Sequence, residues 1–265
     1  MGRSKELAKL ATAYDSGGAL SFRNKIINGN FAINQRGVSG TVTLAAGAYG
    51  HDRWKAGASG CTYTFSASGG VVTLNITAGS LQQVIEDVNV PIGTNTCVMS
   101  WSGTAQGKIG AGSYGASGVT ASVTGGSHLT VEFGTGTLSK VQFEAGVVPT
   151  SFEQRPHGFE LLLCQRYFFN FLGGAAGFAN GTNIVEAAIT FPVEMRAAPQ
   201  AAATGNVQSV NWLGGIANPS SPNVSTLYAG LRGATLRFNN YSGLTSGQGL
   251  VLQGQVATAT FSAEL

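Results

Sequence analysis

The chain has 265 residues, of which 39 are glycine and only 10% are charged, and its formal net charge is +3. The few charges are spread along the chain, which excludes a basic stripe for a phosphate backbone, so nucleic-acid binding is not expected. The glycines follow no Gly-X-Y period, which excludes collagen, and no apolar stretch of about 18 residues predicts a membrane span.

Residues 4–14 predict a short helix near the start of the chain. A serine can cap it, and Leu7, Leu10 and Tyr14 share one face at helical spacing. A helix of this length is marginal alone in water, so its apolar face needs a partner, either the chain's own domain or another protein. A Ser-Gly-Gly turn then predicts a hinge, which makes 1–24 a separate segment.

Residues 25–157 predict the first β domain. Strand-like segments follow one another, and in SHLTVEFGTG the alternation places Leu129, Val131 and Phe133 on one face. Glycine-containing turns recur at roughly 8–12-residue spacing, which is typical of a β-sandwich. About seven or eight such strands predict a jelly-roll.

An extended connector and a helix are expected to follow. The connector lies between Pro149 and Pro156, and the run FELLLCQRYFFNFL predicts a helix over 158–174 that ends at a Gly-Gly pair. Because this run is apolar nearly all round, the helix is expected to be buried between domains or subunits. Residues 175–265 return to strand patterns and predict a second, smaller β-sandwich, so the fold class is all-β.

The cysteines indicate where the chain is made. Cys61, Cys97 and Cys164 are odd in number and lack metal-binding spacing, so they are predicted to be small buried thiols of a chain folded in a reducing cytosol. The N-terminal residues also lack the apolar region of a secretory signal.

Three blocks of sequence carry a resemblance to a known family: KIINGNFAINQRG, AYGHDRWKA and KVQFEAGVVPTSFEQRPHGFELLLCQRYF. With the later TFPVEMRAAP and the terminal AEL, they resemble a recurrent region of tailed-phage fibre and tail proteins over most of the chain from Lys25 onward. The connector and its helix are the most specific part. The resemblance implies a jelly-roll similar to carbohydrate-binding modules, then a C-terminal β domain, in a homotrimeric virion fibre assembled in the host cytoplasm.

The function implied is host attachment through binding of cell-surface polysaccharide, with no particular receptor. The alternative is a purely structural collar, baseplate or capsid-decoration fibre without a ligand. Expected partners are further copies of the chain, host polysaccharide, and other virion proteins that the N-terminal segment would bind through Leu7, Leu10 and Tyr14. Membrane insertion is not expected.

An enzymatic function, such as that of a depolymerase tailspike, is the weakest interpretation. Glycoside hydrolysis needs two carboxylates across a cleft, and the three aspartates lie far apart in the sequence. No nucleophile elbow accompanies the histidines, so serine-hydrolase chemistry is not indicated either. No catalytic residue is predicted.

Aromatic residues in loops are the candidates for glycan binding, because a ring can stack on a sugar face and loops carry binding on such scaffolds. Several tyrosines flank glycine turns, whereas Trp54 and Trp101 are predicted to lie in the core. The glycan candidates are Trp212, Tyr228 and Tyr241 in the C-terminal domain and Tyr63 and Tyr114 in the first domain. The aromatic candidates are also suitable core residues, which is the other interpretation.

The resemblance also raises a structural calcium ion as an alternative, since the opening strand of carbohydrate-binding jelly-rolls often helps to hold one. The candidate ligands are Asn28, Asn30 and Glu144. Calcium prefers several oxygens with carboxylates among them, and Asn30 stands where the pattern often has aspartate. A purely structural role for these residues is therefore the other interpretation, and no other cofactor is expected.

Overall fold

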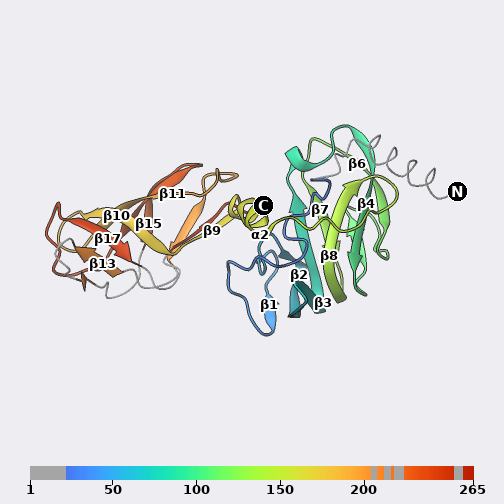
Figure 1. The fold of residues 1–265 in the computed structure, drawn as a ribbon, viewed down its shortest axis with the longest axis horizontal. Helices are drawn as coiled ribbons and strands as arrows, with labels where there is room; N and C mark the ends of the chain where they lie inside the picture. The colour runs from blue at the N-terminus through green and yellow to red at the C-terminus, as the bar shows by residue number, and fades with distance from the viewer. Residues whose placement is uncertain (1–21, 204–207, 212–215, 218–223, 254–258) are drawn as a thin grey trace. The chain divides into compact units, whose positions relative to one another are not determined.

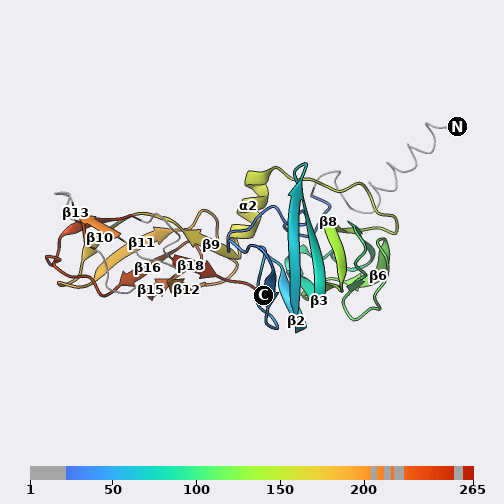
Figure 2. The same cartoon turned by 90° about the horizontal axis from the view of Figure 1, so that it is seen from below.

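The computed structural model describes residues 22–203, 208–211, 216–217, 224–253 and 259–265. Within them the protein is mainly β, with three antiparallel sheets, one short α-helix and a one-turn 3-10 helix, η1 (Asp87–Asn89). The chain divides into two compact units (Figures 1 and 2): unit 1 is residues 1–160 with Leu265, and unit 2 is residues 161–264. No helix in the described residues has the length and apolar character to cross a membrane.

Unit 1 is built on an eight-stranded sheet. Its strands are β1 (Val42–Leu44), β2 (Lys55–Ser68), β3 (Val71–Ile85), β4 (Thr94–Ser102), β5 (Gly107–Ile109), β6 (Val119–Thr124), β7 (Leu129–Phe133) and β8 (Gly136–Ala145). The main order is β1-β2-β3-β8-β4-β6, and β7 pairs with both β3 and β5. The long β3 bonds to β8 through 74–76 and to β7 through 81–85, so the sheet branches there and the unit is sandwich-like.

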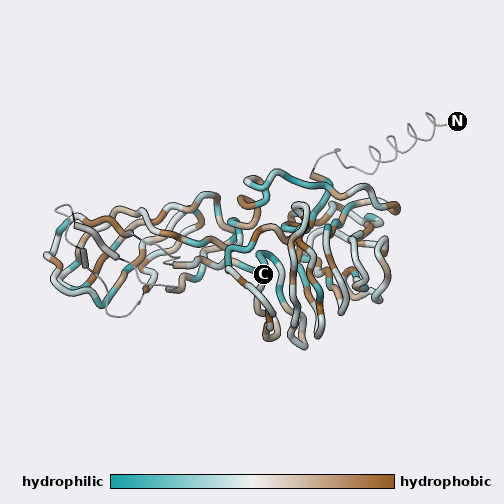
Figure 3. The backbone as a smooth tube through the Cα atoms, turned by 60° about the horizontal axis from the view of Figure 1, so that its bottom comes forward, coloured by the Kyte–Doolittle hydropathy of each residue, from teal (hydrophilic) through white to brown (hydrophobic). Residues whose placement is uncertain are grey.

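The core of unit 1 forms because strands such as β7 alternate between buried and less buried residues. Figure 3 shows hydrophobic and hydrophilic stretches along the backbone of both units. Val131 and Phe133 are fully buried, and Leu129 packs against the same cluster, which confirms the predicted face of β7. Trp54 is also fully buried, and its indole N–H donates to the Asn28 carbonyl oxygen at 3.0 Å. Trp101 is 6% exposed, so the two tryptophans are core residues, as expected.

The helix α2 (His157–Gln165) begins where the sequence predicts it but ends much earlier. Residues 168–171 form strand β9 (Phe168–Phe171), which pairs with β18 (Ala259–Ser262) near the end of the chain. The predicted helix over 158–174 is therefore wrong in its second half, because the aromatic run finds a distant strand partner and aromatic residues suit strands. Phe159 is 37% and Leu162 41% exposed in the single chain, and burial of the helix between domains or subunits stays a prediction.

Unit 2 contains a seven-stranded and a three-stranded antiparallel sheet, which confirms a second β region. The larger sheet, in the order β14-β13-β17-β10-β11-β16-β15, comprises β10 (Gly173–Ala179), β11 (Val185–Thr190), β13 (Gln208–Asn211), β14 (Ile216–Ala217), β15 (Val224–Ala229), β16 (Gly233–Phe238) and β17 (Gly249–Gln253). The smaller sheet is β12 (Gln200–Ala203), β18 and β9. Leu236, Leu252 and Phe261 are fully buried in the core of this unit.

Candidate functional site

Two of the five predicted glycan-binding residues are buried. Tyr63 is 0% and Tyr241 4% exposed, so the expectation of an exposed ring is wrong for both. The Tyr63 hydroxyl lies 3.0 Å from His51 Nδ1, and its ring packs near those of His51 and Phe65. Burial raises the pKa of Tyr241 well above its usual range. A ring without a solvent-facing side cannot stack on a sugar.

Two other predicted residues do expose their rings: Tyr114 is 40% and Tyr228 68% exposed. Tyr228 lies on β15 directly after a register shift against β16, and such a bulge re-aims the side chain that follows it. Trp212 lies outside the described residues, as do Leu7, Leu10 and Tyr14 of the predicted anchor.

The backbone next to Tyr114 is fixed by β5. Gly115 and Gly107 exchange two hydrogen bonds of 2.9 Å, which ties the loop after β5 back onto that strand. A Cβ atom on Gly107 would lie 2.8 Å from the Met99 side chain and 2.9 Å from that of Phe133. A side chain at this position would crowd the core, so glycine suits the close approach of β5.

A row of polar side chains crosses the sheet beside Tyr114. Lys55, Gln82, Glu132 and Lys108 are successive cross-strand partners on β2, β3, β7 and β5. Directly opposite residues share one face of a sheet. Because the neighbours of Glu132 along β7 point into the core, this row lies on the outer face. We call Tyr114 and this row the Tyr114 face.

Contacts at one end of the row hold the Tyr114 ring in place. The Tyr114 hydroxyl donates to Glu132 Oε1 at 2.8 Å, and Lys108 Nζ lies 3.0 Å from Glu132 Oε2. The same ammonium group lies 4.9 Å from the centre of the Tyr114 ring, within the range of a cation–π interaction. Three side chains therefore fix one another, and the ring keeps part of its surface in water.

The electrostatics of the Tyr114 face favour fixed protonation states. Burial alone would raise the pKa of Glu132, but hydrogen bonds from Ser80, Tyr114, Lys108 and Gln82 outweigh it and lower the pKa to about 2. Burial, followed by the Glu132 hydrogen bond and charge, raises the pKa of Tyr114 to about 12. Neither group titrates near neutral pH, so neither is poised as a general acid or base.

Room for the Ser80 contact depends on a glycine. A Cβ atom on Gly57 would lie 2.1 Å from Ser80 Oγ and 3.4 Å from Glu132 Oε1. The absence of a side chain there lets the hydroxyl reach the carboxylate. The Tyr114 face thus offers an aromatic surface, hydroxyl and amide groups, and a neutralised ion pair, a set that suits a polyhydroxylated ligand.

The sequence identified Tyr114 but not the residues that hold it. Alternation around Val131 and Phe133 does place Glu132 on the opposite, outward side, which is a readable signal. The juxtaposition of Glu132 with Lys108 and Gln82 depends on strand register, which no local pattern gives.

The three calcium candidates have structural roles. Asn28 Oδ1 accepts the Ile33 backbone N–H at 2.9 Å, and the Asn28 amide donates to the Ile33 carbonyl. Glu144 Oε1 accepts the backbone N–H of Thr150 at 2.8 Å, and Asn30 Nδ2 donates to the Gly70 carbonyl at 3.0 Å. Each of the three side chains thus holds a backbone segment, in line with the structural interpretation.

A second observation, on the described part of the chain, bears on the metal-binding alternative. No group of three or more histidine, cysteine, aspartate or glutamate side chains lies together there in a way that could hold an ion. The buried cysteines fit the prediction of small core thiols.

Comparisons with known proteins leave the family open. No family model matches the chain, and no curated protein matches it. Among solved structures it is similar to a cycloisomaltooligosaccharide glucanotransferase from Paenibacillus sp. complexed with cycloisomaltoheptaose, at 8% identity and a TM-score of 0.22 over 83% of this chain and 47% of the other. It is also similar to a serine-to-alanine mutant of Bacillus subtilis oxalate decarboxylase, at 10% identity and a TM-score of 0.15 over 86% and 78% of the two chains. The chain spans about half the length of the glucanotransferase, and TM-scores this low do not establish a shared fold.

Proposed function

We propose that the protein is a phage virion fibre subunit that mediates host attachment by binding a cell-surface polysaccharide through the Tyr114 face. The observation that carries the glycan part is the Tyr114 ring, which is 40% exposed yet held by Glu132 and Lys108. A fixed ring loses little conformational entropy when a sugar stacks on it. The virion part rests on the sequence resemblance from Lys25 onward.

The proposal includes a homotrimer with a jelly-roll as unit 1. Single shallow sugar sites bind weakly, and three linked copies turn weak sites into firm adsorption by raising the effective concentration. Light scattering coupled to size exclusion tests this assembly: a stable monomer at micromolar concentration contradicts it.

The proposal also makes residues 1–18 the virion anchor, through Leu7, Leu10 and Tyr14. Deletion of these residues is expected to leave a folded trimer that no longer joins virions. An unfolded deletion protein would instead make the segment part of the core.

The direct test of attachment is an array of bacterial surface polysaccharides probed with the full-length protein. We expect at least one polysaccharide to retain the protein, and the free polysaccharide to compete with phage adsorption to the host that makes it. If no polysaccharide from any permissive host retains the protein or competes, the attachment function fails.

A purely structural collar, baseplate or capsid-decoration fibre is the second candidate. The exposed apolar side chains of α2, Phe159 at 37% and Leu162 at 41%, favour it because such surface is typical of a contact between proteins. If the trimer assembles into virions but no polysaccharide on the array retains it, the result would support this structural function.

A further inference from the structure

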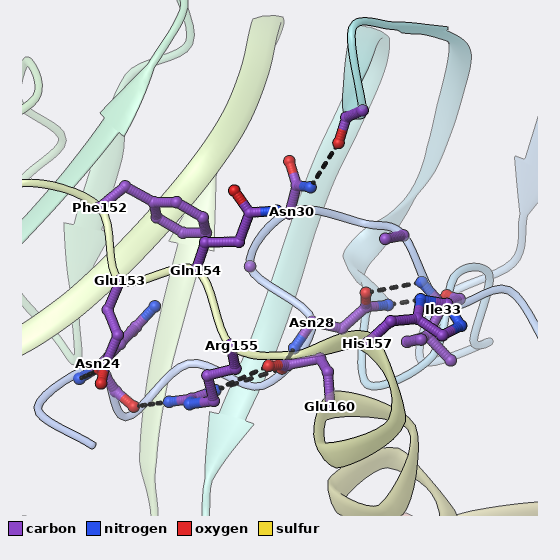
Figure 4. A pocket seen from close by; sticks show the side chains of 13 residues that line it. Asn24, Asn28, Asn30, Ile33, Phe152, Glu153, Gln154, Arg155, His157 and Glu160 are labelled. Carbon is purple, nitrogen blue, oxygen red and sulfur yellow. Dashed lines mark hydrogen bonds and ion pairs between the residues drawn. The ribbon is translucent and has the colours of Figure 1, made fainter. Parts of the chain in front are cut away.

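Unit 1 contains a polar cavity that is separate from the Tyr114 face (Figure 4). Its walls come from the loop 24–33, from Gly70 in the turn between β2 and β3, and from the connector 152–160 as it enters α2. Its volume is about 150 Å³. Ligand-binding clefts span roughly 300–1,000 Å³, so this cavity is suited to a small ligand.

The walls of the cavity are held rigidly by charged side chains. Arg155 Nη1 lies 3.1 Å from Glu160 Oε2 and donates to the Ile26 carbonyl at 3.0 Å. Glu160 in turn accepts the backbone N–H of Asn28, and Glu153 accepts that of Asn24 at 2.8 Å. The connector and the loop are thereby tied together without any ligand, which makes the cavity preorganised.

Two polar atoms in these walls are buried and have no hydrogen-bond partner: Arg155 Nε and Asn30 Oδ1. The Arg155 side chain is only 7% exposed, so its unused N–H is well removed from bulk water. Buried polar groups are nearly always satisfied, so an exception needs an explanation, and a bound water, ion or ligand is one. One of the two atoms is a donor and the other an acceptor.

The charges of the walls disfavour an anionic occupant, and the two unpartnered atoms suit a neutral hydrogen-bonding group. The two terminal nitrogens of Arg155 are engaged by Glu160 and by backbone carbonyls, and the Glu153 carboxylate accepts the backbone N–H groups of Phe22 and Asn24. The walls thus carry one guanidinium, which is already engaged, and two carboxylates, so they offer no free positive charge to an anion. One hydroxyl group can accept the N–H of Arg155 Nε, and another can donate to Asn30 Oδ1. A compound with several hydroxyls can therefore satisfy both atoms.

The mouth of the cavity adds an apolar surface. Phe152 lines it, and Figure 4 shows the ring beside Gln154 and Asn30. An aromatic ring beside amide groups suits the C–H face and the hydroxyls of a sugar. We infer that this cavity binds one neutral sugar residue or a small polyol, with Asn30 and Arg155 as its specific contacts.

This inference does not depend on the proposed attachment function. The cavity shares no residue with the Tyr114 face, and a single sugar would bind there whether or not the protein is a fibre. Binding at the cavity and binding at the Tyr114 face can therefore fail separately.

The test is a set of NMR titrations of the full-length protein with glucose, galactose, mannose, N-acetylglucosamine and glycerol, each taken to tens of millimolar. We expect at least one compound to give saturable shifts in the residues around the cavity. Asn30→Ala removes the unpartnered acceptor and is expected to weaken this binding about three- to tenfold.

Asn95→Ala is the matched control, because Asn95 Nδ2 also donates to a backbone carbonyl, that of Ile92, at 2.8 Å, but lies outside the cavity. It is expected to bind as the wild type does. Tyr114→Ala is also expected to keep this binding even if it loses polysaccharide. The inference is overturned if no compound saturates, which would leave water as the occupant, or if Asn30→Ala binds as tightly as the wild type.

Discussion

The two units stabilise their chain in different ways. In unit 1, buried polar side chains such as Asn28 and Glu144 hold irregular segments by hydrogen bonds to the backbone. In the described part of unit 2, the buried charged side chain is Glu186, which bonds to Asn180 and to Arg237 on the neighbouring strand β16. In unit 1, buried polar side chains therefore hold the loops in place, and both candidate sites of this unit lie beside such loops.

The exposed tyrosines repeat this contrast. Tyr114 in unit 1 is bonded to Glu132 and lies next to Lys108, whereas Tyr228 in unit 2 is the more exposed of the two, at 68% against 40%. A ring held in one orientation is the better platform for a sugar, because less freedom is lost on binding. The comparison therefore favours unit 1 as the place where polysaccharide would bind.

The largest expected effect comes from the core of unit 1. Trp54→Ala removes a fully buried ring that packs on Phe31 and Phe133, and should lower the free energy of unfolding of unit 1 by about 3–5 kcal/mol. Hydrogen exchange with mass spectrometry would report the loss of protection in unit 1. Phe261→Ala is the matched change in unit 2. If each variant loosens both units equally, the division into separately stabilised units is wrong.

A somewhat smaller effect is expected from the ion pair beside the cavity. Arg155→Ala leaves Glu160 without its partner in a site where the two side chains are 7% and 14% exposed, so it should cost about 3 kcal/mol. Arg232→Ala in unit 2 breaks a pair that is 86% and 46% exposed, and should cost less than about 1 kcal/mol. Urea unfolding of both variants measures the difference, and equal costs would refute the contrast in buried polarity.

Acid should weaken unit 1 through His51. Burial lowers the pKa of His51 from 6.5 to about 4, so the folded state favours the neutral ring. This contribution is fully present above pH 6.5 and is lost as the pH falls towards 4, with a total of at most about 3 kcal/mol. His51→Gln should show a shallower loss of stability between pH 7 and pH 5 in urea unfolding. An unchanged pH dependence would show that His51 is not the group responsible.

Local sequence patterns predicted several strands of each unit and the start of α2, because alternation and the proline–glycine boundary depend on neighbouring residues. Strands β1, β5, β10 and β12 were not predicted. The end of α2 was not predictable, since Phe168–Phe171 becomes a strand only by pairing with Ala259–Ser262. Tyr63 and Tyr114 were both predicted to be exposed, but Tyr63 is buried against His51 and only Tyr114 exposes its ring. The cavity likewise depends on the meeting of residues 24–33 with 152–160.

The most direct test is the binding of two tyrosine variants to whichever polysaccharide retains the wild-type protein. Tyr114→Ala should lose most of the retention while its unfolding free energy changes little, because the ring is partly exposed. Tyr228→Ala, the matched change in unit 2, should be retained as the wild type is. Loss of retention in Tyr228→Ala with full retention in Tyr114→Ala would contradict the assignment of polysaccharide binding to unit 1.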